Sequence, residues 1–307
     1  MQKELLFGTD PECAAVYEKN GVIYSYPPFG FRELLGVPVE HRNEKHPEFM
    51  KGDGWKIIED GANFEFTIRP SHNPADLFAA VQDAKKVVES KILVNFPDYC
   101  LPELQFLPTV AWEVEKWNEL IALGIVDEEL FEMSTTFGCD PDEDEFDLEA
   151  KCKILDVKNH PERYCGGHLH VSGSSRIMED HHLAVRCMVI TAGLAAVAFS
   201  DVPDLEKRRT FHYGKPGRFR VQNYGDNPFG DDYRVGIEYR TCSARWLSSW
   251  EIAGPVLHWA GIGIHGLLET SLGEELTKEL VEEACPTILS ADQGKAREIL
   301  AYIETRL

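Results

Sequence analysis

The sequence predicts a single α+β domain that spans residues 1–307. Three observations lead to this prediction. Segments with the alternation of strands are interspersed with longer segments that have the period of helices. Hydrophobic residues make up 43% of the chain, which is enough for a sizeable core. No low-complexity linker divides the sequence, so one domain is the simplest account of its length.

Five segments are predicted to be strands and six to be helices. The predicted strands are residues 4–17, 21–26, 62–69, 165–173 and 233–242. The predicted helices are residues 74–91, 110–123, 178–199, 249–270, 273–284 and 292–305. Pro74 suits the first turn of a helix, and either Ser71 or Asn73 can cap that turn. The C-terminal part, about 249–307, is expected to be helical.

The charge of the chain restricts its partners. Lys and Arg number 31 against 52 Asp and Glu, which gives a net charge of −21. This acidity argues against broad binding to nucleic acid or to an anionic membrane. A small molecule is therefore the expected partner, and an anionic one would need a local basic region.

The sequence favours a cytoplasmic protein. The apolar stretch 183–200 contains Arg186 and is rich in Ala and Gly, so we expect a buried helix there rather than a membrane span. The first four residues, Met-Gln-Lys-Glu, lack the layout of a signal peptide. The eight cysteines form no C-x-x-C pair and are interpreted as reduced thiols. An oligomer is compatible with these features.

Two short segments have opposite charge. Residues 127–149 contain eleven Asp and Glu without Lys or Arg, a composition typical of a solvated loop, with capture of a metal or an amine as the alternative. Residues 207–220 contain six Lys and Arg and no acid, interleaved with Gly and aromatic residues. Arginine can hold a phosphate through two N–H groups, so this segment is a phosphate-binding candidate, with a charge-balancing surface loop as the alternative. Its candidate residues are Arg209, Lys215, Arg218 and Arg220.

Four of the predicted strands have one apolar face and one face that carries reactive groups, because side chains alternate across a strand. Each face alone is compatible with an ordinary solvent-exposed surface. Together the reactive faces carry Asp10, Glu12, Glu65, His168, His170, Glu238 and Arg240. If these strands share a sheet, the groups converge in a basin whose carboxylates need cations, and Mg²⁺ prefers oxygen ligands.

Other interpretations of this pattern stay open. His168 and His170 with a distant acid would also suit Zn²⁺, so a metal-dependent hydrolase is a second hypothesis. A non-catalytic acidic binding or structural protein is a third. Neither a P-loop nor a dinucleotide-binding glycine motif is present. The neighbouring His181 and His182 are interpreted as surface residues.

In their order along the chain, these motifs resemble those of the glutamine-synthetase-like carboxylate–amine ligases. The pattern consists of Gly8-x-Asp10-x-Glu12, Asp60…Glu65, Gly167-His168-x-His170, the basic segment that ends at Arg220, and Glu238-x-Arg240. It is most similar to the phage-encoded COOH·NH2 ligase type 2 group and covers about residues 5–250. The resemblance implies a curved, mainly antiparallel sheet packed on helices, whose concave face holds ATP and two or three Mg²⁺ or Mn²⁺ ions.

The resemblance also implies a role for each motif residue. The implied metal ligands are Asp10, Glu12, Glu65, His168 and Glu238, with Asp60 and His170 as further ones. Arg240 would lie beside the transferred phosphoryl group, and Arg220 and Glu238 would complete the catalytic set. Arg209 and Arg220 would contact the nucleotide phosphates, and Lys215 and Arg218 remain candidates from the basic segment alone. Pro11 departs from the pattern, since a proline between two acids of one strand needs an edge position or a bulge.

The implied activity is ATP-dependent formation of an amide or peptide-like bond between a small carboxylate and an amine. The carboxylate would attack the γ-phosphate of ATP, and the amine would displace phosphate from the resulting acyl phosphate. Metal ions and arginines would stabilise the charge of the phosphoryl step. If the chain is viral, the expected location is the host cytoplasm.

Overall fold

The computed structural model describes residues 5–28, 31, 48–124, 128, 131–132, 143–146, 156–223 and 235–307. The protein is a mixed α+β structure, 50% helical and 23% strand, with several antiparallel sheets. This confirms the predicted fold class in its coarse form. The described strands divide among three sheets rather than forming one.

The five-stranded sheet contains most of the predicted reactive strands. Its order is β1-β11-β13-β12-β9, and all neighbours are antiparallel. The strands are β1 (Leu6–Thr9), β11 (Leu169–Ser172), β13 (Val235–Tyr239), β12 (Arg218–Asn223) and β9 (Glu143–Asp144). One row across it places His170 of β11, Glu238 of β13 and Arg220 of β12 side by side. Because directly opposite residues share a face, these three side chains lie on the same side of the sheet.

Two smaller sheets adjoin it. One has the order β2-β7-β6-β5 and consists of β2 (Glu12–Cys13), β7 (Asn63–Ile68), β6 (Trp55–Asp60) and β5 (Glu48–Gly52). The other has the order β10-β8-β4-β3 and consists of β10 (Glu162–Tyr164), β8 (Thr109–Ala111), β4 (Val22–Tyr26) and β3 (Ala15–Lys19). Only the short contact between β4 and β8 is parallel among the described pairs.

The predicted strand 4–17 is a bent segment that takes part in all three sheets. The chain leaves β1 at Asp10, passes through Pro11, and enters β2 and then β3. Pro11 lies between two edge strands, and its carbonyl accepts a hydrogen bond from the Phe66 amide at 3.0 Å. Proline has no amide hydrogen for a ladder, so the sheet breaks here. Asp10 and Glu12 therefore lie on either side of a junction between sheets.

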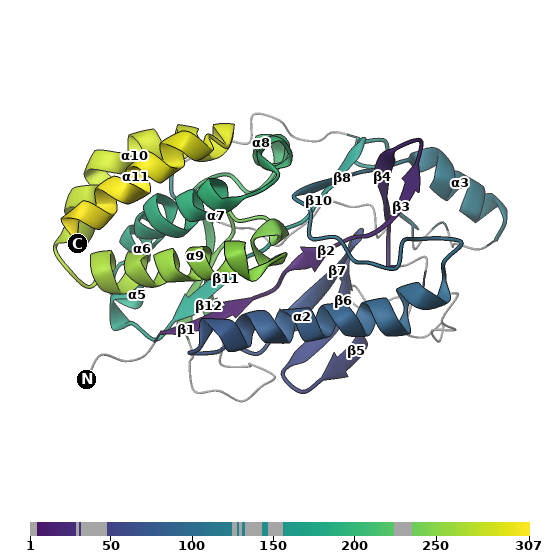
Figure 1. Cartoon of the computed structure of the whole chain (residues 1–307), viewed down its shortest axis with the longest axis horizontal. Helices are drawn as coiled ribbons and strands as arrows, with labels where there is room; N and C mark the ends of the chain where they lie inside the picture. The colour runs from purple at the N-terminus through teal and green to yellow at the C-terminus, as the bar shows by residue number, and fades with distance from the viewer. Residues whose placement is uncertain are drawn as a thin grey trace.

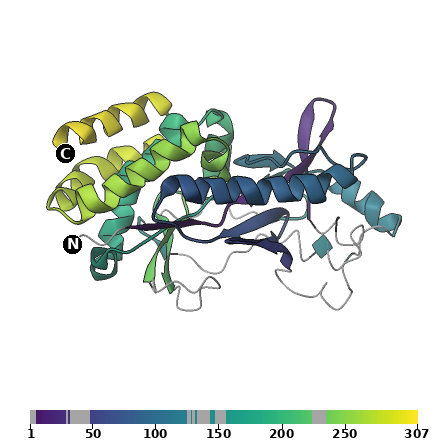
Figure 2. The same cartoon turned by 60° about the horizontal axis from the view of Figure 1, so that its bottom comes forward.

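Helices gather on one side of the sheets (Figures 1 and 2). The long helix α2 (Pro74–Lys91) contacts β1, β6 and β7, and α5 (Ser175–Glu179) and α6 (His181–Met188) contact β13. The remaining helices are α3 (Val114–Ala122), α7 (Leu194–Phe199), α8 (Pro203–His212), α9 (Trp250–Gly261), α10 (Leu272–Ser290) and α11 (Gln293–Arg306). Two π-helical segments, 189–193 and 262–268, extend α6 and α9.

Most helix predictions are confirmed, with shifted ends. Residues 74–91 form one helix as predicted, and the segment after residue 249 is helical. The predicted helix 110–123 starts only at Val114, because Thr109–Ala111 pair in the four-stranded sheet as β8. The basic segment 207–220 is not one loop: it comprises the end of α8, a turn, and the start of β12.

The apolar run His181–Phe199 is long and apolar enough to span a membrane, but 78% of its most apolar window is buried inside the protein. This supports the predicted buried helix. Six cysteines are buried and free, as predicted for reduced thiols: Cys13, Cys100, Cys165, Cys187, Cys242 and Cys285. Cys139 and Cys152 lie outside the described residues.

Asn73 caps α2. Its side-chain oxygen accepts a hydrogen bond from the Ala75 amide at 3.1 Å. We expect Asn73→Ala to lower the free energy of unfolding by about 1 kcal/mol, because that amide loses its partner. Asn73→Asp keeps an acceptor and adds a favourable charge at the helix start, so it should retain the stability of the wild type. Urea denaturation checks both variants, and equal losses would contradict this account of the cap.

Candidate functional site

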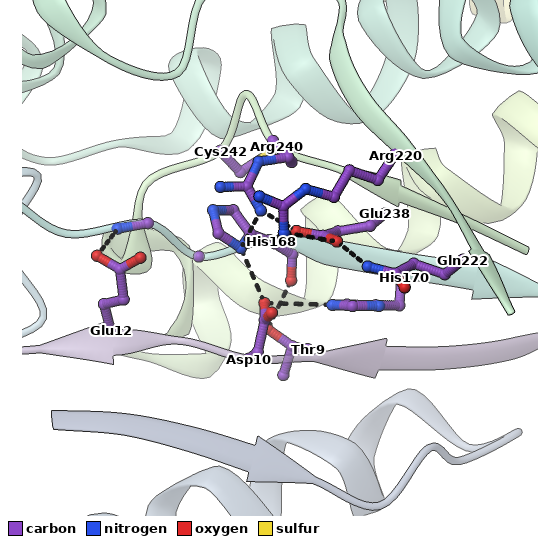
Figure 3. A network of polar contacts seen from close by, with 12 residues as sticks. Thr9, Asp10, Glu12, His168, His170, Arg220, Gln222, Glu238, Arg240 and Cys242 are labelled. Carbon is purple, nitrogen blue, oxygen red and sulfur yellow. Dashed lines mark hydrogen bonds and ion pairs between the residues drawn. The ribbon is translucent and has the colours of Figure 1, made fainter. Parts of the chain in front are cut away.

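A network of acids and histidines forms where β1, β11 and β13 meet (Figure 3). His168 lies just before β11 and is buried, with Nδ1 at 3.1 Å from Asp10 Oδ1 and 3.2 Å from Glu238 Oε1. His170 Nε2 lies 3.2 Å from the same Asp10 oxygen. The ligand atoms of Asp10, His170 and Glu238 are all within 4.8 Å of one another. The structure thus brings together four of the residues predicted from three separate strands.

Two arginines face this cluster. Arg240 is 2% exposed and donates a hydrogen bond to Glu238 Oε1 through Nη1. Arg220 lies across the ladder with Nη1 at 3.7 Å from Glu238 Oε2 and is about one-fifth exposed. Arg240 is thereby fixed by the carboxylate, while Arg220 retains an exposed surface that a ligand can reach.

A second group of carboxylates lies next to the first. Glu12 of β2 is directly opposite Glu65 of β7, and Asp60 ends the neighbouring strand β6. Glu12 is buried, and its Oε2 accepts hydrogen bonds from the Gly166 amide at 2.9 Å and from Asn63 Nδ2 at 3.2 Å. In Figure 3, Glu12 lies to one side of the cluster around His168. All seven predicted metal ligands are therefore in adjacent positions, in two groups.

The surroundings of these groups shift their pKa values in opposite directions. Burial alone would raise the pKa of Asp10, but His168 and His170 outweigh it and hold that pKa far below its usual range. Burial, followed by the charges of Asp10 and Asp60, raises the pKa of Glu65 well above its usual value. The pKa of Glu12 is also raised, mainly by burial and by Asp60. In the group around His168, the histidines stabilise the Asp10 carboxylate. In the group around Glu65, the carboxylates repel one another.

The two donor sets suit different cations. Glu12, Asp60 and Glu65 offer only oxygen, which Mg²⁺ prefers. Asp10, His170 and Glu238 offer one nitrogen and carboxylate oxygens, which also suits Mn²⁺ or Zn²⁺. The residues present thus fit the divalent ions that the sequence predicts.

We compared the sequence with protein-family models and with curated proteins. No protein-family model matches it, and no curated protein is significantly similar to it. The chemistry of the site has to be inferred from its own residues.

Arg209 does not have the position expected of a phosphate-binding residue. It is fully buried in α8, with Nη1 donating to the Thr241 carbonyl at 2.7 Å and Nη2 to the Cys242 carbonyl at 3.0 Å. Its side chain therefore holds the turn after β13 against the helix and has no surface for a ligand. The prediction for Arg209 is wrong for this physical reason.

The other basic candidates lie in the turn after α8 and in β12. Arg218 begins β12 with Nε at 3.4 Å from Asp144 Oδ2 and shares a face with Arg220, as predicted for an extended segment. Lys215 lies in the turn between α8 and β12, where its carbonyl accepts from the Thr241 hydroxyl at 3.0 Å. In that turn Gly217 has a φ of 84°, and a Cβ there would collide with Phe146. The glycine serves the fold of the turn, not an approach to a ligand.

The acidic segment 127–149 lies mostly outside the described residues. Among its described residues, 143–146 are not simply a solvated loop, because residues 143–144 form the edge strand β9. Glu145 accepts from Arg186 Nε at 2.6 Å and lies 2.6 Å from His182 Nδ1. These pairs attach the segment to α6.

Sequence reasoning missed three residues of the site. The Tyr213 hydroxyl lies 3.0 Å from His168 Nε2 and accepts from Arg240 Nη2 at 3.1 Å. Gln222 donates to Glu238, and Asn63 donates to Glu12. Tyr213 is one of the aromatic residues interleaved in the basic segment 207–220, but only the fold shows that it bridges a histidine and an arginine.

Proposed function

We propose that this chain is an ATP- and Mg²⁺-dependent carboxylate–amine ligase with a glutamine-synthetase-like catalytic sheet. The observation that carries the proposal is that Asp10, His170 and Glu238 lie beside Arg220 and Arg240 at the five-stranded antiparallel sheet, next to a second carboxylate group on the adjoining sheet. Phosphoryl transfer from ATP needs this combination, because most of its catalysis comes from positioning and from stabilising charge.

In this proposal two groups of side chains bind metal ions and the arginines act on the phosphates. Glu12, Asp60 and Glu65 would hold Mg²⁺, and Asp10, His170 and Glu238 would hold a second divalent ion, with His168 between the latter acids. Bound metal ions would neutralise phosphate oxygens and orient the nucleotide. Arg220 reaches toward the open side of the sheet and would contact a phosphate, while Glu238 and Tyr213 keep Arg240 in a fixed orientation.

The bond changes balance without a further reactant. An oxygen of the substrate carboxylate bonds to the γ-phosphorus as the bond to ADP breaks. The amine nitrogen then attacks the acyl carbon, phosphate leaves, and the amine gives up one proton. The substrates are small carboxylates and amines such as amino acids or polyamines.

The experiment that tests the proposal is a screen for ADP release by the purified chain. Mg²⁺, ATP and pools of carboxylates and amines are supplied, and the product is identified by mass. We expect ADP formation that depends on one carboxylate and one amine, together with a higher melting temperature in Mg²⁺ and ATP. Absence of both would contradict the ligase proposal.

The control variants separate the alternatives. Arg220→Gln should reduce ATP-dependent stabilisation, whereas Arg245→Gln, far from ATP in this proposal and paired with the half-exposed Asp201, should not. Chelator-sensitive hydrolysis without ATP that tolerates Arg220→Gln would point instead to a metal-dependent hydrolase. Full tolerance of Glu65→Ala and Glu238→Ala would point to a non-catalytic protein.

A further inference from the structure

A third group of potential metal ligands, Glu143, His181 and His182, lies on the opposite face of the five-stranded sheet. In the pairing of β9 with β12, Asp144 is opposite Arg218 and Glu143 is opposite Phe219. The ion pair of Asp144 with Arg218 places both on the face that carries Arg220 and Glu238. Glu143 and Phe219 consequently point to the other face, which the helices cover.

Two histidines meet Glu143 there. His181 and His182 begin α6, where Asp180 caps the helix by accepting from the Leu183 amide at 2.8 Å. Their rings lie 5.8 Å and 5.9 Å from the buried ring of Phe219, measured between centroids. The cap and the packing on Phe219 fix both imidazoles above β9.

The three side chains present a set of metal donors. One ligand atom each from Glu143, His181 and His182 lies within 4.8 Å of the others. Glu143 and His182 are exposed, so an ion has access from solvent. Two imidazole nitrogens and one carboxylate oxygen form a set that suits Zn²⁺ and related transition metals, with water in the remaining position.

His182 also has the partner that a metal-bound histidine usually has. Its Nδ1 lies 2.6 Å from Glu145 Oε2, and Arg186 fixes the second oxygen of Glu145 at 2.6 Å. The Glu145 side chain is 2% exposed. A carboxylate on one ring nitrogen sets the tautomer that leaves the other nitrogen available to a metal and makes it more basic.

We propose that Glu143, His181 and His182 form a binding site for Zn²⁺ or a similar transition metal ion, with Glu145 as the residue that positions His182. The ion joins the two-residue edge strand β9 to the start of α6. A strand of that length has few ladder bonds of its own, so a metal link would stabilise the edge of the sheet on which Arg218 and Arg220 lie. The site is separate from the candidate active site and does not depend on the proposed ligase activity.

The test measures Zn²⁺ binding to the full chain by elemental analysis after dialysis and by isothermal titration. The double variant His181→Gln/His182→Gln is expected to lose one equivalent of Zn²⁺ per chain. Glu238→Gln is expected to retain the Zn²⁺ ion bound at His181 and His182, because Glu238 belongs to the cluster on the other face of the sheet. Glu145→Gln should weaken binding at this site by about 10–100-fold.

The matched control is His265→Gln, since His265 also pairs with a glutamate, at 2.9 Å from Glu269, but belongs to neither group of possible metal ligands among the described residues. It should bind as much Zn²⁺ as the wild type. Zn²⁺ should also slow amide exchange at residues 143–146 in the wild type and not in the double variant. Equal Zn²⁺ content and affinity in the wild type and the double variant would overturn the proposal.

Discussion

Replacing Arg240 by glutamine is expected to lower the free energy of unfolding by about 3–5 kcal/mol, because it leaves the buried Glu238 carboxylate without the guanidinium that is hydrogen-bonded to it. Arg240 and Glu238 are 2% and 1% exposed and hydrogen-bonded to each other. Burial and Asp10 raise the pKa of Glu238, but His168, His170 and Arg240 outweigh them and keep the pKa below its usual value. Denaturant titration of the metal-free protein measures the loss.

A double-mutant cycle sharpens this prediction. Glu238→Gln in the Arg240→Gln background should recover part of the lost stability, since neither buried charge then remains. Arg245→Gln is the matched control: its guanidinium pairs with Asp201, which is about half exposed, so its loss should stay near 1 kcal/mol or below. Strictly additive losses for Arg240 and Glu238 would show that their pairing does not stabilise the fold.

Replacing Glu65 by glutamine is expected to have opposite effects with and without Mg²⁺. Glu65 lies opposite Glu12, and burial together with Asp10 and Asp60 raises its pKa well above the usual value. The metal-free variant should therefore be more stable than the wild type at neutral pH. At 100 times the dissociation constant, Mg²⁺ should add about 2.7 kcal/mol to the wild type and much less to the variant.

The raised pKa of Glu65 also predicts how the stability difference between Glu65→Gln and the wild type depends on pH. A carboxyl whose pKa is higher in the folded state stabilises the fold fully below its unfolded pKa, and this contribution is lost as the pH rises through the folded pKa. The advantage of metal-free Glu65→Gln over the wild type should thus grow with pH above about 4.5. Thermal unfolding at several pH values, with and without Mg²⁺, checks this. Glu251→Gln, on the exposed start of α9, is the control: it should leave the Mg²⁺ response unchanged, and because hydrogen bonds lower the pKa of Glu251, any change in its pH slope should have the opposite sign.

The sequence predicted what depends on local pattern. The α2 helix, with Pro74 at its start and Asn73 as its cap, follows from residues close together in the chain. The alternation in 165–173 placed His168 and His170 correctly on the reactive side, although β11 itself begins only at Leu169. The single apolar–polar pattern of residues 4–17 could not reveal three sheets, because the break depends on which distant strands pair on either side of Pro11.

The burial and the contact partners of individual side chains in the site could not be predicted from the sequence. Arg209 and Arg220 belong to one basic segment, yet Arg209 lies inside the protein and Arg220 lies on the sheet face. Charge density along the chain cannot distinguish them, since burial depends on the end of α8 packing beneath the turn after β13. The contact of Tyr213 with both His168 and Arg240 likewise joins segments 45 and 27 residues apart.

The bend at Pro11 fixes the number of residues between Asp10 and Glu12 rather than the type of residue at position 11. Hydrogen bonds fix the chain on both sides of the junction, from the Phe66 amide to the Pro11 carbonyl and from the Glu12 amide to the Gly166 carbonyl. Inserting or deleting one residue between Asp10 and Glu12 would displace one of the two carboxylates from its site, because these hydrogen bonds leave the chain no slack between the two sheets. In a library of variants, position 11 should accept several small residues, whereas any change of spacing should be absent from every functional clone.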